Sequence, residues 1–213
     1  MRVLVVTAVP AERDAVTRAC PGVDTVVGGV GPAAAAAATA TALARTPSPY
    51  DLVVSAGIGG GFAPLAPVGS LVVASRIVAA DLGADTPDGY LDVEELGFGR
   101  SVHLPPAALA QAIAAATGAA YAPVLTVSTV TGTAERAAAL TRRHPGAGAE
   151  AMEGFGVAEA AGLHGVPVVE IRAVSNAVGP RDRSAWRIGD ALAALGDAFG
   201  KLPPVLESWN GHD

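Results

Sequence analysis

Short apolar runs alternate along the chain with Ala-rich or mixed segments, and this alternation predicts strands and helices. Residues 2–7 contain four consecutive Val or Leu residues, which is typical of a strand buried on both faces. Residues 33–44 form an Ala-rich segment after Pro32, whose missing N–H costs little at a helix start. The same reasoning predicts strands at residues 2–7, 25–27, 51–56, 70–79, 121–129, 149–152 and 166–174. It predicts helices at residues 11–18, 33–44, 105–117, 133–143 and 153–164, and a mostly helical segment at residues 182–199.

Strands that alternate with helices are typical of the α/β class. We therefore expect a three-layer α/β/α sandwich with a central mixed, mostly parallel sheet. The length of 213 residues is compatible with a single domain, residues 1–213. Ligands of such sheets bind beyond the C-terminal ends of the strands. Functional side chains are accordingly expected just after Val6, Ala56, Thr129, Met152 and Val174.

Three segments interrupt the regular alternation. Residues 57–61 contain four glycines and fit a tight turn as well as a loop whose amides approach a ligand. Residues 81–100 are polar and predicted to be flexible, acting as a lid or reaching the site from a partner subunit. The C-terminal tail with Pro203 and Pro204 is predicted to be loose.

The charge of the chain narrows the classes of partner. The formal net charge is −6, so we expect neither a general nucleic-acid surface nor a general attraction to anionic lipids. The uncharged stretches 26–44 and 52–75 are broken by Gly and Pro, and we interpret them as parts of a buried sheet rather than membrane spans. Because no targeting segment is apparent, we expect a cytoplasmic protein.

Cysteine and histidine give no indication of a disulfide or a metal site. Cys20 is the single cysteine, so no internal disulfide can form, and we interpret it as structural filler. Trp186 and Trp209 are expected to serve packing or an interface. The histidines lack the spacing of metal ligands and are expected on the surface or in loops: His103, His144, His164 and His212.

Four polar groups lie at the expected ligand edge of the sheet. Glu12 follows the first strand near a helix start, where a carboxylate can take a proton from water or stabilise the helix dipole. Glu153 follows Met152 and can accept two hydrogen bonds from ribose hydroxyls or begin a helix. Arg172 lies in an apolar strand and requires an acidic partner, whereas Asn176 can donate and accept at once. The residues by themselves leave a structural role open for each group.

Taken together and in this order, these segments resemble the family of methylthioadenosine/adenosylhomocysteine nucleosidases and related nucleoside phosphorylases, over nearly the whole chain. The more specific pieces are Ala151-Met152-Glu153 and the run from Ile171 to Asn176. The resemblance implies that Glu12 holds the attacking water, that Met152 and Glu153 bind the ribose, and that Arg172 orients the carboxylates. It also implies an N-glycosyl hydrolase that uses no metal or cofactor, binds a small nucleoside and forms a homodimer or larger homo-oligomer.

The resemblance also assigns positions around the base. Val130 and Thr131 match the backbone positions that flank the purine, and Ile58 and Gly59 fall in the loop that faces the sugar and water. The adenine-specific members end the last strand with Ser-Asp, where this chain has Ser175-Asn176. We expect Ser175 to bind substrate and Asn176 to be catalytic, together with Glu12 and Arg172.

The neutral amide at the end of this strand changes the expected base. The NH₂ of Asn176 can donate to O6 of a 6-oxopurine and its carbonyl can accept from protonated N7. A 6-amino group would instead face the NH₂ unfavourably, so Asn176 favours hypoxanthine over adenine. In this respect the chain is similar to the futalosine-hydrolysing members, which release hypoxanthine and dehypoxanthine futalosine in a route to menaquinone.

Other activities are compatible with the same residues. An aminofutalosine or methylthioadenosine/adenosylhomocysteine nucleosidase is the first alternative, and a nucleoside-binding module without activity is the second. A phosphorylase would need a phosphate pocket near the first loop, where Glu12 would repel the anion. Futalosine also carries a benzoate, which a basic residue should meet, and the sequence offers Arg76, Arg181 and Arg183 without choosing among them.

Overall fold

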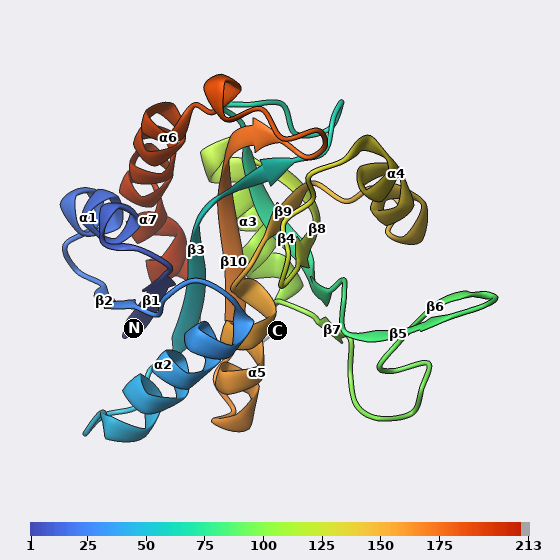
Figure 1. The fold of residues 1–213 in the computed structure, drawn as a ribbon. Coiled ribbons are helices and arrows are strands. Elements are labelled where there is room, and N and C mark those ends of the chain that lie inside the picture. The colour runs from blue at the N-terminus through green and yellow to red at the C-terminus, as the bar shows by residue number, and fades with distance from the viewer. Residues whose placement is uncertain (210–213) are drawn as a thin grey trace.

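A mixed β-sheet forms the middle of the fold, with helices on both faces (Figure 1). The computed structural model describes residues 1–209. These observations confirm the α/β sandwich with a central mixed sheet. The strands of this sheet are β1 (Val3–Thr7), β2 (Asp24–Val27), β3 (Leu52–Gly61), β4 (Leu71–Ala79), β7 (Val102–His103), β8 (Ala120–Thr126), β9 (Ala149–Ala151) and β10 (Val168–Ala177).

The strand order brings the C-terminal ends of distant segments together. The order is β10-β4-β8-β9-β3-β1-β2, and β10 also pairs with β3. The strands β3, β10, β4, β8 and β9 therefore close on themselves, while β1 and β2 extend the sheet from β3. The pairings β1–β2, β1–β3, β3–β10, β4–β8 and β8–β9 are parallel, as expected for a mostly parallel sheet.

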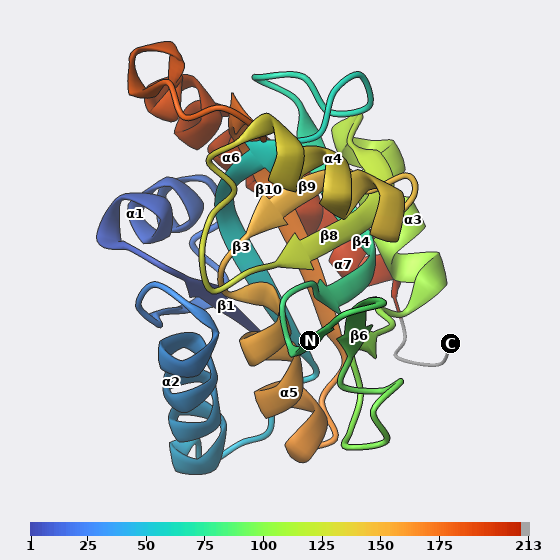
Figure 2. The same ribbon diagram turned by 45° about the vertical axis from the view of Figure 1, so that its right-hand side comes forward.

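Two groups of helices bury the two faces of the sheet. On one face lie α1 (Pro10–Ala19), α3 (Ala107–Thr117), α6 (Ile188–Gly200) and α7 (Leu202–Ser208). On the other face lie α2 (Pro32–Arg45) and α5 (Gly154–Leu163), and α4 (Ala134–Arg143) packs beside the ends of β8 and β9 (Figure 2).

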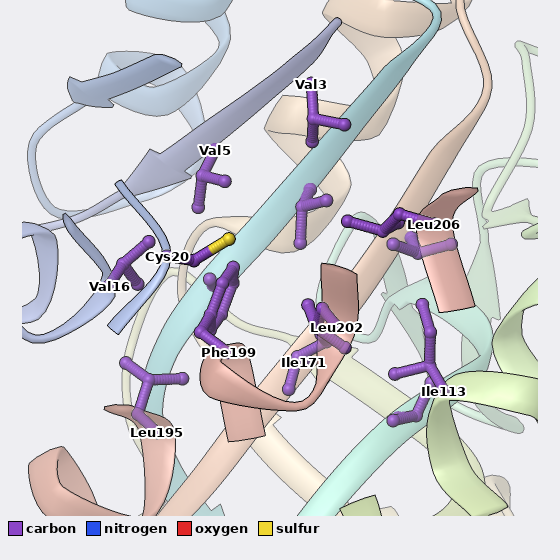
Figure 3. Close-up of a cluster of buried hydrophobic side chains, with 14 of the residues drawn as sticks. Val3, Val5, Val16, Cys20, Ile113, Ile171, Leu195, Phe199, Leu202 and Leu206 are labelled. Atoms are coloured by element: carbon purple, nitrogen blue, oxygen red, sulfur yellow. The ribbon is translucent and has the colours of Figure 1, made fainter. Parts of the chain in front are cut away.

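Strand β1 shows why the sheet needs cover on both sides. Successive side chains of a strand point to opposite faces. Val3 and Val5 pack against Val16, Leu195 and Phe199 on one face (Figure 3), whereas the intervening side chains join the core under α2 and α5. Each fully buried aliphatic side chain contributes about 1.5–3 kcal/mol. The uninterrupted apolar run thus stabilises both layers at once.

The segment of residues 57–61 is a strand and not the predicted turn or loop. Strand β3 continues through Gly61 because it is paired on both sides, with β10 and with β9. A Cβ at Gly61 would lie 2.0 Å from the carbonyl oxygen of Ala66. The glycines are therefore required by the close approach of neighbouring chain segments.

Residues 81–100 and the C-terminal tail are more regular than predicted. The first segment contains an antiparallel hairpin, β5 (Gly83–Thr86) with β6 (Gly89–Asp92), which projects from the body of the protein (Figure 1). The tail with Pro203 and Pro204 forms α7, because Leu202 and Leu206 are buried in the core beside α3.

The expectation for the histidines was wrong at His103. This residue lies in β7, is 8% exposed, and its Nε2 is 2.7 Å from Oε1 of Glu159 on α5. His144 is half-buried, His164 is exposed, and His212 lies outside the described residues. Cys20 is buried in the core, as predicted. None of the helices in residues 1–209 combines the length and apolarity that crossing a membrane requires.

Candidate active site

A cavity of about 370 Å³ opens where the parallel strands end. It receives residues from the loop after β1, from the ends of β3 and β10, and from the segments that follow β8 and β9. The carboxyl edge of the sheet was the expected position of the ligand. The cavity is lined by nine of the ten predicted site residues: Glu12, Ile58, Gly59, Val130, Thr131, Met152, Glu153, Ser175 and Asn176.

The Glu12 carboxylate is held by three backbone N–H groups. Oε2 accepts from Ala8 at 2.8 Å and from Val9 at 3.2 Å, and Oε1 accepts from Ile58 at 2.9 Å. Glu12 lies in the first turn of α1, and its side chain reaches back to the N-terminal end of its own helix. Only 3% of the residue is exposed. These contacts fix both oxygens and leave the carboxylate facing the cavity.

Arg172 lies beneath the cavity rather than in its lining. Its Nε donates to Oε1 of Glu170 at 2.8 Å, and its Nη1 is 3.1 Å from Oε2 of Glu153. Its Nη2 donates to Oγ of Ser55 at 3.1 Å. The acidic partner that a buried Arg requires is thus a pair of carboxylates, of which only Glu153 was singled out from the sequence.

The charges around Arg172 do not balance. Burial by itself would lower the pKa of the guanidinium, but the carboxylates of Glu170, Glu153 and Glu12 raise it above its ordinary value. Burial raises the pKa of the Glu170 carboxyl, although Arg172 opposes this effect. One oxygen of Glu170 has no hydrogen-bond partner within residues 1–209. Burial, and to a smaller extent the neighbouring Glu153 carboxylate, therefore favours a proton on Glu170 more than on an exposed Glu.

Glu153 begins α5 and faces the cavity with one side of its carboxylate. Oε1 accepts from the backbone N–H of Gly31 at 3.2 Å, and Oε2 accepts from that of Met152 at 3.3 Å. Together with Arg172, these donors fix the carboxylate while its remaining lone pairs stay available. Met152 is half-buried and lines the cavity beside it.

The Asn176 amide is oriented by its neighbour. The hydroxyl oxygen of Ser175 lies 2.8 Å from Oδ1 of Asn176 and 3.2 Å from the carbonyl oxygen of Gly59. Nδ2 of Asn176 donates to the carbonyl oxygen of Ala177 at 3.1 Å. This places one donor and one acceptor of a neutral amide on the cavity wall, at the end of β10.

The sequence analysis missed Glu150, which lies in the short buried strand β9 and lines the cavity. Its Oε1 accepts from the backbone N–H of Thr131 at 2.8 Å, and its Oε2 is 2.5 Å from the Thr131 hydroxyl. Burial raises the pKa of this carboxyl, and the two bonds from Thr131 oppose the shift. The available signal was a charged residue between Ala149 and Ala151 in a buried strand.

The outer wall of the cavity contains a cation and an aromatic ring. Arg181 and Trp186 both line it, and the guanidinium carbon of Arg181 is 5.5 Å from the centroid of the Trp186 ring. The expectation that Trp186 serves packing or an interface therefore missed its position at the cavity. The guanidinium carbon of Arg183 lies 5.8 Å from the centroid of the same ring, but Arg183 does not line the cavity. Arg76 is exposed on β4. Residues 81–100, predicted as a lid or as a contribution from a partner subunit, are absent from this lining.

The sequence profile of the phosphorylase superfamily matches residues 8–202 of the chain. A futalosine hydrolase of Streptomyces coelicolor is 65% identical, with 100% of both chains covered. A futalosine hydrolase of Acidothermus cellulolyticus is 46% identical, covering 93% of this chain and 89% of the relative.

Solved structures show the same fold at much lower identity. The 5'-methylthioadenosine/S-adenosylhomocysteine nucleosidase of Neisseria meningitidis, in complex with methylthio-immucillin-A, has a TM-score of 0.81 at 19% identity, and 98% of this chain and 99% of that chain are covered. The corresponding nucleosidase of Colwellia psychrerythraea, in complex with adenine, has a TM-score of 0.79 at 22% identity, and 95% of this chain and 96% of that chain are covered. By its profile match and its full-length relatives, the chain belongs to the phosphorylase superfamily and, within it, to the family of futalosine hydrolases.

Proposed function

We propose that the chain hydrolyses the N-glycosidic bond of futalosine and releases hypoxanthine, as a single-domain enzyme of menaquinone biosynthesis. The observation that carries the proposal is the cavity itself, in which a fixed carboxylate, Glu12, and a neutral amide, Asn176, share one lining. The identity to futalosine hydrolases over the full chain supports the choice of substrate.

The proposed reaction separates an electron-poor sugar from an electron-rich base. Glu12 orients a water molecule toward C1′ and accepts its proton, because the three N–H donors hold the carboxylate in one position. The departing 6-oxopurine takes a proton from solvent at N7, and Glu12 returns the proton of the attacking water to solvent. Asn176 stabilises this base by donating from its NH₂ to O6 and accepting from N7–H through its carbonyl. Electrostatic placement of this kind is commonly the largest contribution to catalysis.

The ribose is held by Glu153 and Met152. Glu153 accepts hydrogen bonds from the sugar hydroxyls while Arg172 and the Gly31 N–H keep its carboxylate in place. Met152 packs on the sugar from the same wall of the cavity. In this arrangement Arg172 acts through the carboxylates, because it does not itself line the cavity.

The contacts of Glu12 favour hydrolysis over phosphorolysis. Backbone N–H groups at a helix N-terminus are the usual donors to a phosphate. Here the N–H groups of Ala8 and Val9, at the start of α1, are occupied by the Glu12 carboxylate. A phosphate placed there would lose these donors and meet a negative charge.

The benzoate of futalosine is assigned to Arg181. Among the three candidates from the sequence, Arg181 is the one that lines the cavity. The neighbouring Trp186 ring offers a flat apolar surface to an aromatic acid. A carboxylate and a guanidinium can then form a charge-assisted hydrogen bond.

We further propose that the enzyme works in the cytoplasm as a homodimer or larger homo-oligomer. Phe98, Leu104 and Leu163 are large apolar side chains that are 82%, 74% and 83% exposed, and their burial between chains would stabilise an assembly. Light scattering coupled to size-exclusion chromatography would give the number of chains, and a monomer at micromolar concentration would contradict the assembly.

The test of the function is product analysis with four nucleosides in parallel: futalosine, aminofutalosine, inosine and methylthioadenosine. We expect free hypoxanthine from futalosine, at a rate that does not depend on added phosphate. Adenine from aminofutalosine or methylthioadenosine as the main product would favour the adenine-specific alternative. A dependence on phosphate would indicate a phosphorylase, and binding without release of any base would indicate a nucleoside-binding module.

A further inference from the structure

Glu150 and Asn176 project from the same face of the sheet on the two sides of β3. Glu150 of β9 and Asn176 of β10 are both register partners of Gly60. Register partners on neighbouring strands point to the same side of a sheet. The register of β10 shifts between Val174 and Asn176, but Asn176 pairs with Gly60 beyond this shift and lines the same cavity as Glu150. Two strand spacings, about 10 Å, therefore separate the backbones from which the carboxylate and the amide extend.

Gly60 keeps the space between these two side chains open. A Cβ at this position would lie 2.9 Å from Cγ2 of Val178 and 3.3 Å from Nδ2 of Asn176. Gly60, Glu150 and Asn176 all line the cavity. The absence of a side chain on the central strand thus allows a planar ring to contact both polar groups.

The Glu150 carboxylate keeps hydrogen-bonding capacity beyond its contacts with Thr131. Each oxygen of a carboxylate can accept two hydrogen bonds, and Thr131 occupies one site on each. Glu150 forms no salt bridge within residues 1–209. The carboxylate therefore has two further acceptor sites, on a residue that lines the cavity.

A 6-oxopurine presents a donor that matches this carboxylate. In the keto form the ring carries N1–H next to O6, whereas a 6-aminopurine has an unprotonated N1 with a lone pair. A carboxylate accepts from the first and repels the second. O6 lies between N1 and N7, so a group at N1 and a group at N7 approach the ring from the two sides of O6.

We propose that Glu150 is a second specificity-determining residue, whose carboxylate accepts a hydrogen bond from N1–H of the 6-oxopurine while Asn176 binds O6 and N7. This assignment rests on the proposed function and names the group that recognises the third polar position of the base. A site built to bond a substrate N–H rejects an analogue without it by large factors, because the buried acceptor is then left unpaired.

The test compares futalosine with aminofutalosine, which differ at position 6 of the base and therefore at N1. In Glu150→Gln the amide can donate to an unprotonated N1, so we expect the ratio of kcat/KM for futalosine to that for aminofutalosine to fall at least tenfold relative to the wild type. Glu135→Gln is the matched control, since Glu135 is an exposed carboxylate at the start of α4, and its ratio should equal that of the wild type. Equal losses for both substrates in Glu150→Gln would mean that the residue only anchors Thr131, and would overturn the proposal.

If Glu150→Gln does not fold, a binding measurement on the wild type tests whether N1–H of the base is recognised. Calorimetry with hypoxanthine and with 1-methylhypoxanthine, which lacks N1–H, should show at least tenfold tighter binding of hypoxanthine. Equal affinities would overturn the role of Glu150. The proposed function fails separately, namely if the wild type releases no hypoxanthine from futalosine.

Discussion

The Glu12 carboxylate accepts a hydrogen bond from the backbone N–H of Ile58, with 2.9 Å between Oε1 and N. This contact joins the first turn of α1 to strand β3, across 46 residues of sequence. It fixes the carboxylate that we propose as the general base against the wall of the cavity where the sugar is expected. Small displacements of this carboxylate should therefore reduce catalysis more than they reduce stability.

Gly57→Ala tests the position of Glu12 without changing its chemistry. A Cβ at Gly57 would lie 2.6 Å from Oε1 of Glu12 and 2.8 Å from Nη1 of Arg172, so both groups would have to move. Because a displacement of about 1 Å can reduce a rate about 100-fold, we expect kcat to fall by roughly this factor. Gly22→Ala is the control, since its Cβ would meet nothing within 4 Å. Equal kcat values for the two variants would show that catalysis by the Glu12 carboxylate does not require the space left by Gly57.

Asn176→Asp should move the preference of the enzyme toward 6-aminopurines. The carboxyl that replaces the amide can protonate N7 or accept from a 6-amino group, whereas it loses the NH₂ donor to O6. We expect the ratio of kcat/KM for futalosine to that for aminofutalosine to fall at least tenfold. The measurement is steady-state release of hypoxanthine and adenine, and an unchanged ratio would remove the physical reason for assigning a 6-oxopurine to this site.

Arg181→Gln should weaken the binding of futalosine but not that of inosine, which lacks the benzoate. A hydrogen bond between two charged groups contributes about 1.5–3 kcal/mol, so the KM for futalosine should rise roughly 10- to 100-fold. Arg76→Gln serves as the control, because Arg76 is exposed on β4 and does not line the cavity. A larger effect from the control than from Arg181→Gln would reverse the assignment.

The raised pKa of the Glu170 carboxyl leads us to expect that the free energy of unfolding depends on pH. Burial raises the pKa of its carboxyl above the ordinary value of 4.5, so the folded state binds the proton more tightly than the unfolded chain does. The stabilisation from this proton is complete below about pH 4.5, the ordinary pKa of a Glu carboxyl. It is lost as the pH rises through the pKa that Glu170 has in the folded state. Glu170→Gln cannot titrate at this position, and its free energy of unfolding relative to the wild type should therefore increase with pH.

Urea denaturation of both proteins between pH 4.5 and 8 measures this difference. Because the wild type loses its stabilising proton as the pH rises, we expect the stability of Glu170→Gln relative to the wild type to increase across this range. Glu135→Gln should show a flat difference. A relative stability of Glu170→Gln that falls with pH would mean that Arg172 keeps Glu170 fully ionised.

Much of the fold could be predicted because its strands are buried on both faces. Such strands are continuous apolar runs, as in β1 and β10, and they are visible without knowledge of their partners. The glycines of residues 57–61 illustrate the opposite case. Their strand conformation depends on pairing with β9 and β10, which lie roughly 90 and 115 residues away in the sequence, and glycine by itself disfavours a strand. Local composition therefore indicated a tight turn or a ligand loop.

The candidate site could be predicted where a polar residue lies at the end of an apolar strand or just beyond it, as for Asn176 and Glu12. Glu150 and Glu170 were missed because each lies inside a buried strand, where the sequence shows a charge but not what it contacts. Their roles depend on Thr131 and Arg172, which the fold brings beside them. The sequence also offered three arginines for one carboxylate, and the proposal of Arg181 required the position of the cavity.

The most direct test of the account is the release of hypoxanthine from futalosine by the wild type and by Glu12→Gln, without added phosphate. The amide cannot accept a proton from water, and general-base catalysis contributes about 10²- to 10⁴-fold to such reactions. We expect kcat to fall by at least 100-fold in Glu12→Gln, while calorimetry shows that futalosine still binds with similar affinity. A variant that cleaves futalosine as fast as the wild type would contradict the assignment of Glu12 as the base that activates water.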